Sequence, residues 1–510
     1  NTETIWRRLH QEPHRSVDSE VIPALVRAWI DKHQSVEGAG DFVLRECEGT
    51  VAALVLAPEL GKMLAFSNNG SLYTGRHRGQ EFFASERVSL LEVGCSQAEQ
   101  VFRERCVDVP QSTSPIRENN LETKYGGSLL ADLGRSRKEE ALLNTYIPAL
   151  RRCTKCVLPE TMPFIEFDRD GTCNYCNHYV ARNTPKPLEE LVSTLENFRR
   201  PEGPECIVPF SGGRDSSFAL HVACRVLGLR CVAYTYDWGM ITDLGRRNIS
   251  RMCSQLRVEN IVVAADIRRK RKNIRLNLQA WLDSPHLGLI SLLTAGDKHF
   301  FKYVDQIRNQ TGVSLNLWGI NPLEVTHFKA GFLGVPPDFD EQRVYASKAR
   351  KQIDYQFRRF RAMTGSHRYF NTSLWDTLSG EYYRSVQAKT DYFHFFDYWR
   401  WDEDEIDSVL SDYQWEVAPD TTSTWRIGDG TAAFYNYIFF TLAGFTEHDT
   451  FRSNQVREGD ITRDDALKLV AEENAPRYPN IRWYLDSVGM DYSETIEKIR
   501  RIKPLWEQDR

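Results

Sequence analysis

The most constraining feature of the sequence is an alternation of apolar and amphipathic segments that starts at residue 205. ECIVPF is followed by the turn SGGRDS, by SFALHVACRVLG, which ends at Gly228, and by RCVAYTYD. The apolar runs have the length of buried strands, and the segments between them have the spacing of helices. Strands that alternate with helices in this way form a parallel sheet covered by helices. We therefore predict an α/β fold with a doubly wound parallel sheet, followed from about residue 275 by a helix-rich part.

The first hundred residues follow a different pattern. VDSEVIPALVRAWI places Val21, Leu25 and Trp29 near helical spacing, which predicts a helix. Apolar runs bounded by turn residues come next: TVAALVLA, GKMLAFS, SLYTGR and EFFASE. These segments predict an α+β domain with a strand meander over residues 1–105.

The length of 510 residues is too great for one compact core, and about three domains are expected. After the first domain we place a connector at 106–150, a cysteine module at 151–200 and the α/β domain with its helical part at 201–510. Two assignments within the last part rest on composition. The basic run 268–272 is interpreted as a solvated helix face rather than a phosphate-binding patch, and the aromatic run 392–401 as packing rather than a stacking site for a sugar or base.

Composition restricts the class of protein. Apolar residues make up 41% and charged residues 26% of the chain, as in ordinary packed domains. The formal charge is only -5, so nucleic acid is not favoured as a partner without a local basic patch. The longest apolar stretch, near residues 437–445, is too short to cross a bilayer, and the first residues lack the apolar core of a signal peptide. We expect a cytoplasmic protein with no membrane partner.

The turn SGGRDS has the composition of a phosphate-binding loop. Its consecutive small residues allow several backbone N–H groups to converge, and the following helix adds its positive N-terminal end. The candidate ligands of a pyrophosphate are Ser211, Gly212, Gly213, Ser216 and Ser217, while Asp215 could orient the loop or bind Mg²⁺. A Walker loop is excluded because no Gly-Lys-Ser/Thr ending is present. The alternative is a glycine-rich turn that only connects a strand to a helix.

Two cysteine pairs precede this loop. Cys153 and Cys156 form one pair, Cys173 and Cys176 form the other, and sixteen residues separate them. Each pair can bind one side of a tetrahedral ion, so the spacing predicts a closed, structural site for Zn²⁺ with four thiolate ligands. An iron–sulfur cluster and four unrelated buried cysteines are the alternatives.

The loop resembles that of the PP-loop ATP pyrophosphatases, which cleave ATP to AMP and pyrophosphate while adenylating an oxygen of their substrate. CTKCVLPETMPFIEFDRDGTCNYC and VPFSGGRDSSFALH together look like the N-acetyl sugar amidotransferase branch of that family. Its members convert an acetamido group on a sugar into an acetamidino group in surface-polysaccharide biosynthesis. The resemblance extends over about residues 150–505, through YDWGMITDLGRRNI, LNLWGINPLE and REGDITRDDAL. It implies an adenine nucleotide alpha hydrolase-like fold, the use of ATP and Mg²⁺, and an acetamido (nucleotide) sugar as the acceptor.

The resemblance also implies roles for single residues. Ser211, Gly212, Gly213, Asp215 and Ser216 would bind the pyrophosphate part of ATP, and Tyr236, within the strand end 234–237, would lie near the adenosine. Asp215, Asn321 and Glu324 would be catalytic, and Arg452 and Asn454 would lie near the rim of the site. Lys298, Lys329 and Arg426 are candidates from residue type alone for neutralising phosphate charge. The chain departs from the family at WGINP, where an acidic residue usually precedes the asparagine.

The N-terminal segment VDSEVIPALVRAW and the strands after it look like the later half of a class II (Ntn-type) glutaminase domain, as in glucosamine-6-phosphate synthase and asparagine synthetase. In that family the aspartate of DSE binds the α-amino group of glutamine, which implies this role for Asp18; a helix N-cap is the alternative. The family's nucleophile is an N-terminal cysteine, whereas position 1 is Asn. We expect the first half of the domain to precede Asn1; a degenerate glutaminase, or one completed by another polypeptide, is the alternative.

These resemblances predict a glutamine-dependent and ATP-dependent amidotransferase. An amide carbonyl of the acceptor would be adenylated, and ammonia from glutamine would then replace its oxygen to give an amidine. An asparagine-synthetase-like ligase acting on a carboxylate and a tRNA-modifying PP-loop enzyme remain as alternatives. We also expect a homo-oligomer.

Overall fold

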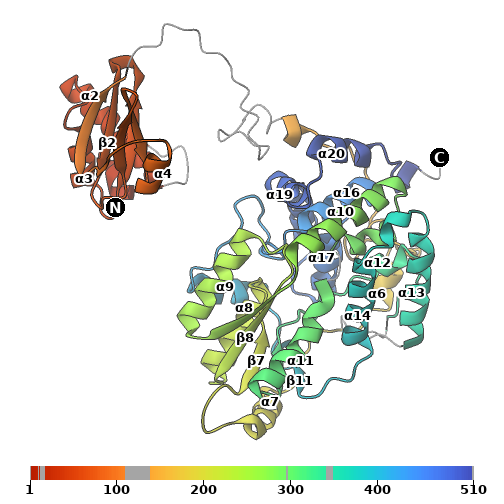
Figure 1. Ribbon diagram of the computed structural model, residues 1–510. Helices are drawn as coiled ribbons and strands as arrows, with labels where there is room; N and C mark the ends of the chain where they lie inside the picture. Colours follow the sequence, from red (N-terminus) through yellow and green to blue (C-terminus); the bar gives the residue numbers. More distant parts are fainter. Residues whose placement is uncertain are drawn as a thin grey trace. The chain divides into compact units, whose positions relative to one another are not determined.

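The computed structural model describes residues 2–9, 11, 18–109, 138–294, 297–339 and 349–507. The chain divides into two compact units, Asn1–Ser128 and Leu129–Arg510, and each is described by itself (Figure 1). The predicted connector at 106–150 lies largely outside the described residues. The predicted cysteine module belongs to the second unit.

The first unit combines helices with two small antiparallel sheets. Its elements are α1 (Thr2–Leu9), a 3₁₀ turn (Asp18–Glu20), α2 (Val21–His33), α3 (Ala39–Glu46), β1 (Ala52–Ala57), β2 (Lys62–Ser67), β3 (Tyr73–His77), β4 (Gln80–Ala84), α4 (Arg87–Glu92), β5 (Ala98–Gln100) and β6 (Arg103–Asp108). The predicted helix and the four predicted strands are confirmed. Asp18 starts the 3₁₀ turn, and its side chain lies outside the described residues.

The strands of the first unit do not form the predicted meander. β6 returns to pair with β2, which gives the sheet β1-β2-β6, and β5 pairs with β3 in the sheet β4-β3-β5. Leu64 and Phe66 of β2 are fully buried with Val26 of α2 and Val43 of α3. β2 thus contributes buried residues to this core and lies between β1 and β6 in the sheet. Sequence alternation alone carried no information on this pairing.

The second unit contains the predicted parallel sheet. Its strands are β7 (Cys206–Pro209), β8 (Cys231–Asp237), β9 (Glu259–Ala264), β10 (Leu315–Trp318) and β11 (Tyr392–His394), and their order is β11-β10-β7-β8-β9. Every pairing is parallel, with Cys206 opposite Cys231 and Leu315. The chain therefore adds β8 and then β9 on one side of β7, and afterwards adds β10 and then β11 on the other side.

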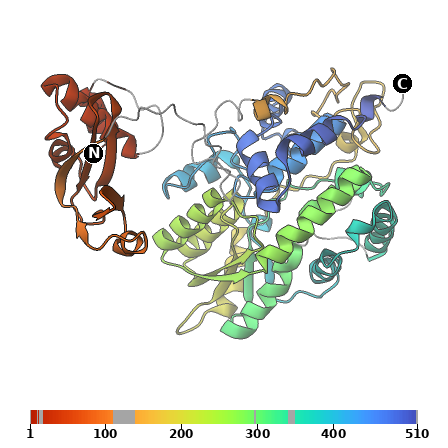
Figure 2. The ribbon, with the colours of Figure 1, turned by 45° about the horizontal axis from the view of Figure 1, so that its top comes forward.

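Helices cover both faces of this sheet (Figure 2). Cys206 and Val208 face a core formed with α7 (Leu188–Leu195), α8 (Arg214–His221, continued by a π-helical turn at Val222–Val226), α9 (Asp243–Leu256) and α15 (Glu403–Ser411). Ile207 faces the opposite core, which contains α11 (Phe300–Thr311). The sheet is thus doubly wound, as predicted. The aromatic run also behaves as predicted, because Phe395, Phe396 and Trp401 are buried in the first of these cores.

A large helical part packs beside the sheet. It includes α10 (Ile267–Asp283), α12 (Phe328–Gly331), α13 (Ala349–Met363), α14 (Ser373–Ser385), α16 (Ala432–Ala443), α17 (Glu447–Glu458), α18 (Arg463–Glu473), α19 (Tyr478–Val488) and α20 (Tyr492–Arg500). The apolar α16 is buried at its centre, and in the described part of the chain no helix has both the length and the apolar character needed to cross a membrane. The basic run is solvated as predicted at Arg268, Arg269 and Lys272, which are exposed. Lys270 departs from the prediction because it is buried against Asp376, and the half-buried Arg271 donates to the Gly239 carbonyl.

Candidate active site and metal centre

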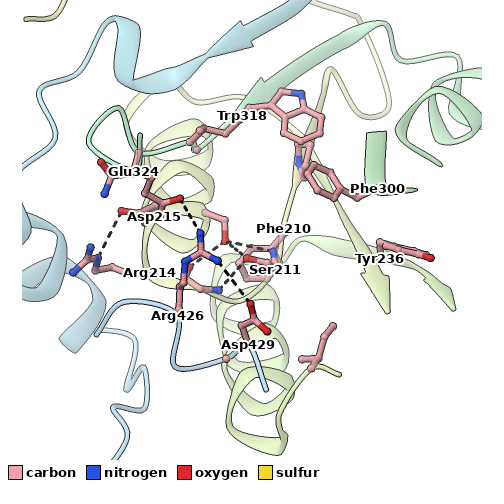
Figure 3. A pocket seen from close by; sticks show the side chains of 18 of the residues that line it. Phe210, Ser211, Arg214, Asp215, Tyr236, Phe300, Trp318, Glu324, Arg426 and Asp429 are labelled. Carbon is pink, nitrogen blue, oxygen red and sulfur yellow. Dashed lines mark hydrogen bonds and ion pairs between the residues drawn. The ribbon is translucent and has the colours of Figure 1, made fainter. Parts of the chain in front are cut away.

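A cavity of about 310 Å³ opens at the carboxyl end of the parallel sheet (Figure 3). It lies where β7 is flanked by β8 on one side and β10 on the other, so the strand order reverses at this point. Crevices at such a reversal are the usual ligand sites of open α/β sheets. The loop after β7 and the loop after β10 both contribute to its wall.

The second half of the loop SGGRDS forms the first turn of α8. Gly213 has extended φ and ψ angles and caps α8, which begins at Arg214, so the helix starts inside the predicted turn. The hydroxyl groups of Ser211 and Ser216 lie 3.1 Å apart, and Gly213 N–H donates to Ser211 Oγ at 3.3 Å. Gly212 has φ +74°, which is unfavourable for residues with a side chain. The first backbone N–H groups of α8 have no helical partner, so this turn can donate hydrogen bonds to an anion.

Most of the predicted site residues line this cavity. They are Ser211, Gly213, Asp215, Ser216, Tyr236, Asn321 and Glu324. Gly212 and Ser217 are not part of the lining; Ser217 is fully buried behind the loop. Gly319, directly after β10, also lines the cavity, and a Cβ there would lie 2.6 Å from the Asp215 carbonyl oxygen. The absence of a side chain at Gly319 therefore lets the loop after β10 approach the start of α8.

The carboxylate of Asp215 contacts two side chains whose role the sequence did not reveal. Trp401 Nε1 donates to Asp215 Oδ1 at 2.6 Å, and Arg214 Nε lies 3.6 Å from the same oxygen. Arg214 is fully buried and stacks over the Trp401 ring. Its guanidinium pairs with Glu403 at the start of α15. These contacts fix the direction of the Asp215 side chain.

Glu403 joins this network to α17. It accepts from Arg214 and from Arg452, and Arg452 also pairs with Glu473 at 2.5 Å. Arg452 is 4% exposed and does not line this cavity, so the position at the rim predicted for it is wrong. Asn454 is also buried, and its Nδ2 donates to the Leu323 carbonyl at 2.8 Å. Both residues are held inside by polar partners on segments distant in sequence.

Glu403 should make stability sensitive to acid. Burial alone would raise its pKa, but Arg214 and Arg452 lower the pKa from 4.5 to about 2. Because the folded pKa is below the unfolded one, the stabilisation is present above pH 4.5 and is lost as pH falls toward 2. Glu403→Gln leaves two buried cations short of a partner, and we expect it to lower the free energy of unfolding at pH 7 by about 3–5 kcal/mol.

Urea unfolding of wild type and Glu403→Gln at several pH values between 7 and 3 measures this effect. The difference between the two proteins should shrink below pH 4.5, because the wild type alone loses this ion pair. Asp404→Asn, at the exposed neighbouring position of α15, serves as the control and should change stability little. A difference that stays constant with pH would contradict the assignment.

Asn321 presents an unused donor at the other side of the cavity. The residue is 1% exposed, and its Oδ1 accepts from Leu323 N–H at 2.9 Å. Its Nδ2 has no hydrogen-bond partner within the described residues, although it is buried. A buried donor without a partner is costly unless a ligand uses it. Asn321 is therefore placed to donate to an oxygen of a molecule bound in the cavity.

A second cavity, of about 410 Å³, adjoins the first. The two share Phe300, Glu324, Arg426 and Asp429. Arg426 has φ +55°, and its guanidinium lies between Glu324 and Asp429 at 3.7 and 3.9 Å (Figure 3). A left-handed backbone at a residue other than glycine is strained, and such strain is concentrated at functional sites. Burial raises the pKa of Glu324, which Arg426 partly counteracts.

The four cysteines form a separate site. Their Sγ atoms all lie within 4.8 Å of one another, with 4.0 Å between Cys153 and Cys176 and 3.8 Å between Cys156 and Cys173. Tetrahedral zinc with bonds of about 2.3 Å places its sulfur ligands about 3.8 Å apart. An iron–sulfur cluster binds its thiolates through different irons, which spreads them farther apart. The geometry therefore fits a single ion.

The surroundings of the thiolates also suit a metal. Three of the four cysteines are fully buried, and Cys173 N–H donates to Cys153 Sγ at 3.2 Å. Arg457 of α17 donates to Cys156 Sγ at 3.2 Å and to Cys176 Sγ at 3.3 Å. The guanidinium offsets the negative charge that four thiolates around a divalent ion would carry. The cysteines line neither of the two cavities described above.

Sequence identity between this chain and similar solved structures is low. No protein-family model matches the sequence, and no curated protein matches it. Among solved structures, NMN synthetase from Francisella tularensis has 14% identity and a TM-score of 0.19, with coverage of 40% of this chain and 99% of that chain. U34-tRNA thiolase NcsA from Methanococcus maripaludis, solved with its 4Fe-4S cluster, has 12% identity and a TM-score of 0.25, with coverage of 68% and 89%. Similarity at this level is too low to support an inference about this chain.

Proposed function

We propose that the second unit is an ATP-dependent enzyme that cleaves ATP to AMP and pyrophosphate and adenylates an oxygen of an acceptor. The observation that carries this proposal is the serine- and glycine-rich turn at the start of α8, which opens into a cavity where the strand order reverses. Backbone donors at a helix N-terminus and two serine hydroxyls suit the pyrophosphate part of a nucleotide. The aromatic side chains of Tyr236, Phe300 and Trp318 on the opposite wall suit its base (Figure 3).

The residues also fit Mg²⁺. Asp215 and Asp429 both line the cavity, and Mg²⁺ in nucleotide sites is held by one or two carboxylates together with phosphate oxygens. When bound, the ion would neutralise charge on the phosphates. The Asp215 side chain is directed by Trp401 Nε1 and Arg214. Its role in the proposal is to hold the metal–phosphate complex in place.

The junction of the two cavities is the proposed place of reaction. An amide oxygen of the acceptor would attack the α-phosphorus of ATP, and the bond to pyrophosphate would break. Ammonia would then attack the imidate carbon, AMP would leave, and a proton would be lost to give the amidine. In this proposal Asn321 Nδ2, which has no partner among the described residues, donates to the acceptor, and Glu324, whose pKa is raised by burial, accepts the proton.

The finer assignments follow the sequence resemblance. The acceptor is proposed to be an acetamido group on a nucleotide-linked sugar, and ammonia is proposed to come from glutamine at a site to which Asp18 contributes. Zn²⁺ is the proposed ion of the four cysteines, in a structural role. A role for these cysteines in sulfur delivery to RNA is disfavoured, because they are buried, bonded to Arg457 and outside both cavities.

Incubation with ATP, Mg²⁺ and a panel of acetamido nucleotide sugars tests the proposal, with ammonium or glutamine as the nitrogen source. AMP and pyrophosphate should appear in equal amounts. Mass spectrometry should show an acceptor whose mass falls by the difference between an oxygen atom and an NH group. A carboxylate acceptor that becomes an amide would instead support the asparagine-synthetase-like alternative. Absence of AMP with every acceptor and with both nitrogen sources would refute the proposal.

A further inference from the structure

The second cavity has an uneven distribution of charge. Among the described residues, its lining contains five basic side chains and two acidic ones; the basic residues are Lys298, Lys329, Lys351, Arg384 and Arg426, and the acidic ones are Glu324 and Asp429. The first cavity differs, because its charged lining consists of Arg214, Arg426, Asp215, Glu324 and Asp429. Among the described lining residues, basic side chains therefore outnumber acidic ones in this second cavity, or second chamber, but not in the first cavity.

Two lysines that line this chamber pair with carboxylates that do not line it. Lys298 Nζ lies 2.8 Å from Glu381, and Lys329 Nζ contacts Glu447. Both carboxylates are buried, at 6% and 0% side-chain exposure, and neither lines the chamber. The lysine side chains retain 27% and 29% exposure. The two carboxylates thus fix the positions of the Lys298 and Lys329 ammonium groups. Because these carboxylates do not line the cavity, basic residues still predominate on its described surface.

The chamber wall also includes a tyrosine in a positive environment. Burial alone would raise the pKa of Tyr355, yet Arg359 and Lys298 lower it below its ordinary value. The nearby His327 is neutral, since burial together with Arg182 and Lys351 lowers its pKa to about 3.

We propose that the second chamber binds a phosphate or diphosphate group of the acceptor, with Lys298 and Lys329 as its main cationic contacts. The identity of the ligand as the acceptor rests on the function proposed above. A volume of about 410 Å³ suits a small molecule rather than a strand of RNA. The shared wall at Glu324 and Arg426 would then place the reacting end of the acceptor beside the nucleotide.

Calorimetric titration with uridine diphosphate, cytidine monophosphate and orthophosphate tests this site. The first cavity is saturated beforehand with α,β-methylene-ATP, so that the probes cannot bind there. We expect one molar equivalent of at least one probe to bind, and its affinity to fall at least tenfold in Lys298→Gln and in Lys329→Gln. Both variants should fold, because Arg384 still pairs with Glu381, and Arg426 and Tyr435 still contact Glu447.

Lys302→Gln is the matched control. This lysine is exposed on α11 and lines neither cavity, so the affinity for the probe should not change. Binding of the ATP analogue should also be unchanged in all three variants. If the analogue binds but no probe does, or if probe affinity survives both substitutions, the chamber assignment is wrong while the proposed ATP site stands. Tight binding of an oligoribonucleotide that requires both lysines would also overturn it. Failure of the analogue to bind would count against the proposed function instead.

Helices α13 and α14 present an independent feature. In α14 the polar side is buried and the apolar side is exposed, which is the reverse of the usual arrangement in a surface helix. α14 buries Ser373, Thr377, Gly380 and Glu381 and exposes Trp375, Leu378 and Tyr382, of which Trp375 is 73% exposed. Ile353, Phe357 and Phe360 of α13 are also exposed. The ring of Phe360 on α13 lies 5.6 Å from that of Phe370, which precedes α14, and the two helices lie side by side in both ribbon views (Figures 1 and 2). An apolar face of this size is unusual on an isolated protein.

We infer that this face joins two copies of the chain. Its eight large side chains are Ile353, Phe357, Phe360, Phe370, Trp375, Leu378, Tyr382 and Val386. At roughly 100 Å² each they would bury roughly 800 Å² per copy, the contribution of each partner to a stable interface. A two-fold dimer brings the same patch of both copies together. The opposite side of α13 carries Tyr355 and Lys351 of the second chamber, so the dimer would also support that wall.

Light scattering of the full chain tests this inference. The wild type should have the mass of a dimer, and Trp375→Glu and Phe357→Glu should have the mass of a monomer. Val226→Glu, at a half-exposed apolar position on the π-helical turn after α8, is the control and should remain dimeric. A monomeric wild type, or dimers that persist in both variants, would overturn the inference.

Discussion

Replacing Gly212 by alanine should abolish AMP formation while most of the fold is retained. A Cβ at this position would lie 2.8 Å from the Gly245 carbonyl oxygen and 2.6 Å from Ile249 Cγ1, both on α9. Since the carbonyl belongs to the helix backbone, the loop must move instead. A displacement of about 1 Å in a positioning group can cost about a hundredfold in rate, so we expect at least this loss. Exchange of labelled pyrophosphate into ATP and formation of AMP are the measurements.

Gly203→Ala separates this effect from backbone strain. Gly203 has φ +75°, close to the +74° of Gly212, but a Cβ there would have no atom within 4 Å. Both variants should lose about 1 kcal/mol or more from the left-handed backbone, and only Gly212→Ala should lose turnover. Equal activities in the two variants would show that the loop is not the phosphate site.

The sequence predicted those features of the site that depend on short, continuous segments of the chain. The loop at 211–216 could be recognised because its small residues and its strand and helix are adjacent in the chain. The cysteine site could be recognised because two close pairs have the spacing of a tetrahedral ion. In both cases the geometry depends on a short segment, and the structure places its atoms accordingly.

The rest of the site is assembled from distant segments. Asp215 is directed by Trp401, and Arg214 by Glu403, which are nearly two hundred residues away. The second chamber combines positions from Ile290 to Phe439 and leaves no sequence motif. The prediction for Arg452 failed for the same reason, since its burial depends on Glu403 and Glu473.

The helical spacing of apolar residues also gives a wrong prediction of burial where the apolar side of a helix does not pack inside the chain. The spacing of Trp375, Leu378 and Tyr382 on α14 would normally mark the inward side of a helix. In the structure this side is exposed, because Glu381 turns inward to pair with Lys298 and Arg384. The inward side of α14 thus carries the buried ion pairs of Glu381 in place of an apolar stripe.

Removal of the metal from the cysteine site should have the largest effect on stability. Structural zinc contributes about 10–16 kcal/mol of apparent binding energy in small zinc domains, and that energy is available only to the folded state. In Cys153→Ser one thiolate is lost and the remaining three are left buried in a core with Leu158 and Tyr175. We expect the variant to retain less than one metal ion per chain and to unfold at a much lower denaturant concentration. Elemental analysis and urea unfolding measure the two effects.

Cys253→Ser is the control for the loss of a buried thiol. Cys253 lies on α9, is also buried, and is not part of the cysteine site. It should lower stability modestly and leave the metal content unchanged. A Cys153→Ser protein with full metal content and near wild-type stability would contradict a structural site.

The effect of the metal should reach both cavities through α17. Arg457 near the end of this helix contacts two thiolates, and Glu447 at its start contacts Lys329, Arg426 and Tyr435. Arg457→Met should therefore weaken metal affinity by about 10–100-fold, as loss of an outer partner does. In this variant pyrophosphate exchange should fall at limiting Zn²⁺ and recover when excess Zn²⁺ is added. Recovery would locate the defect in the position of α17, because the residues that line the nucleotide cavity are unchanged.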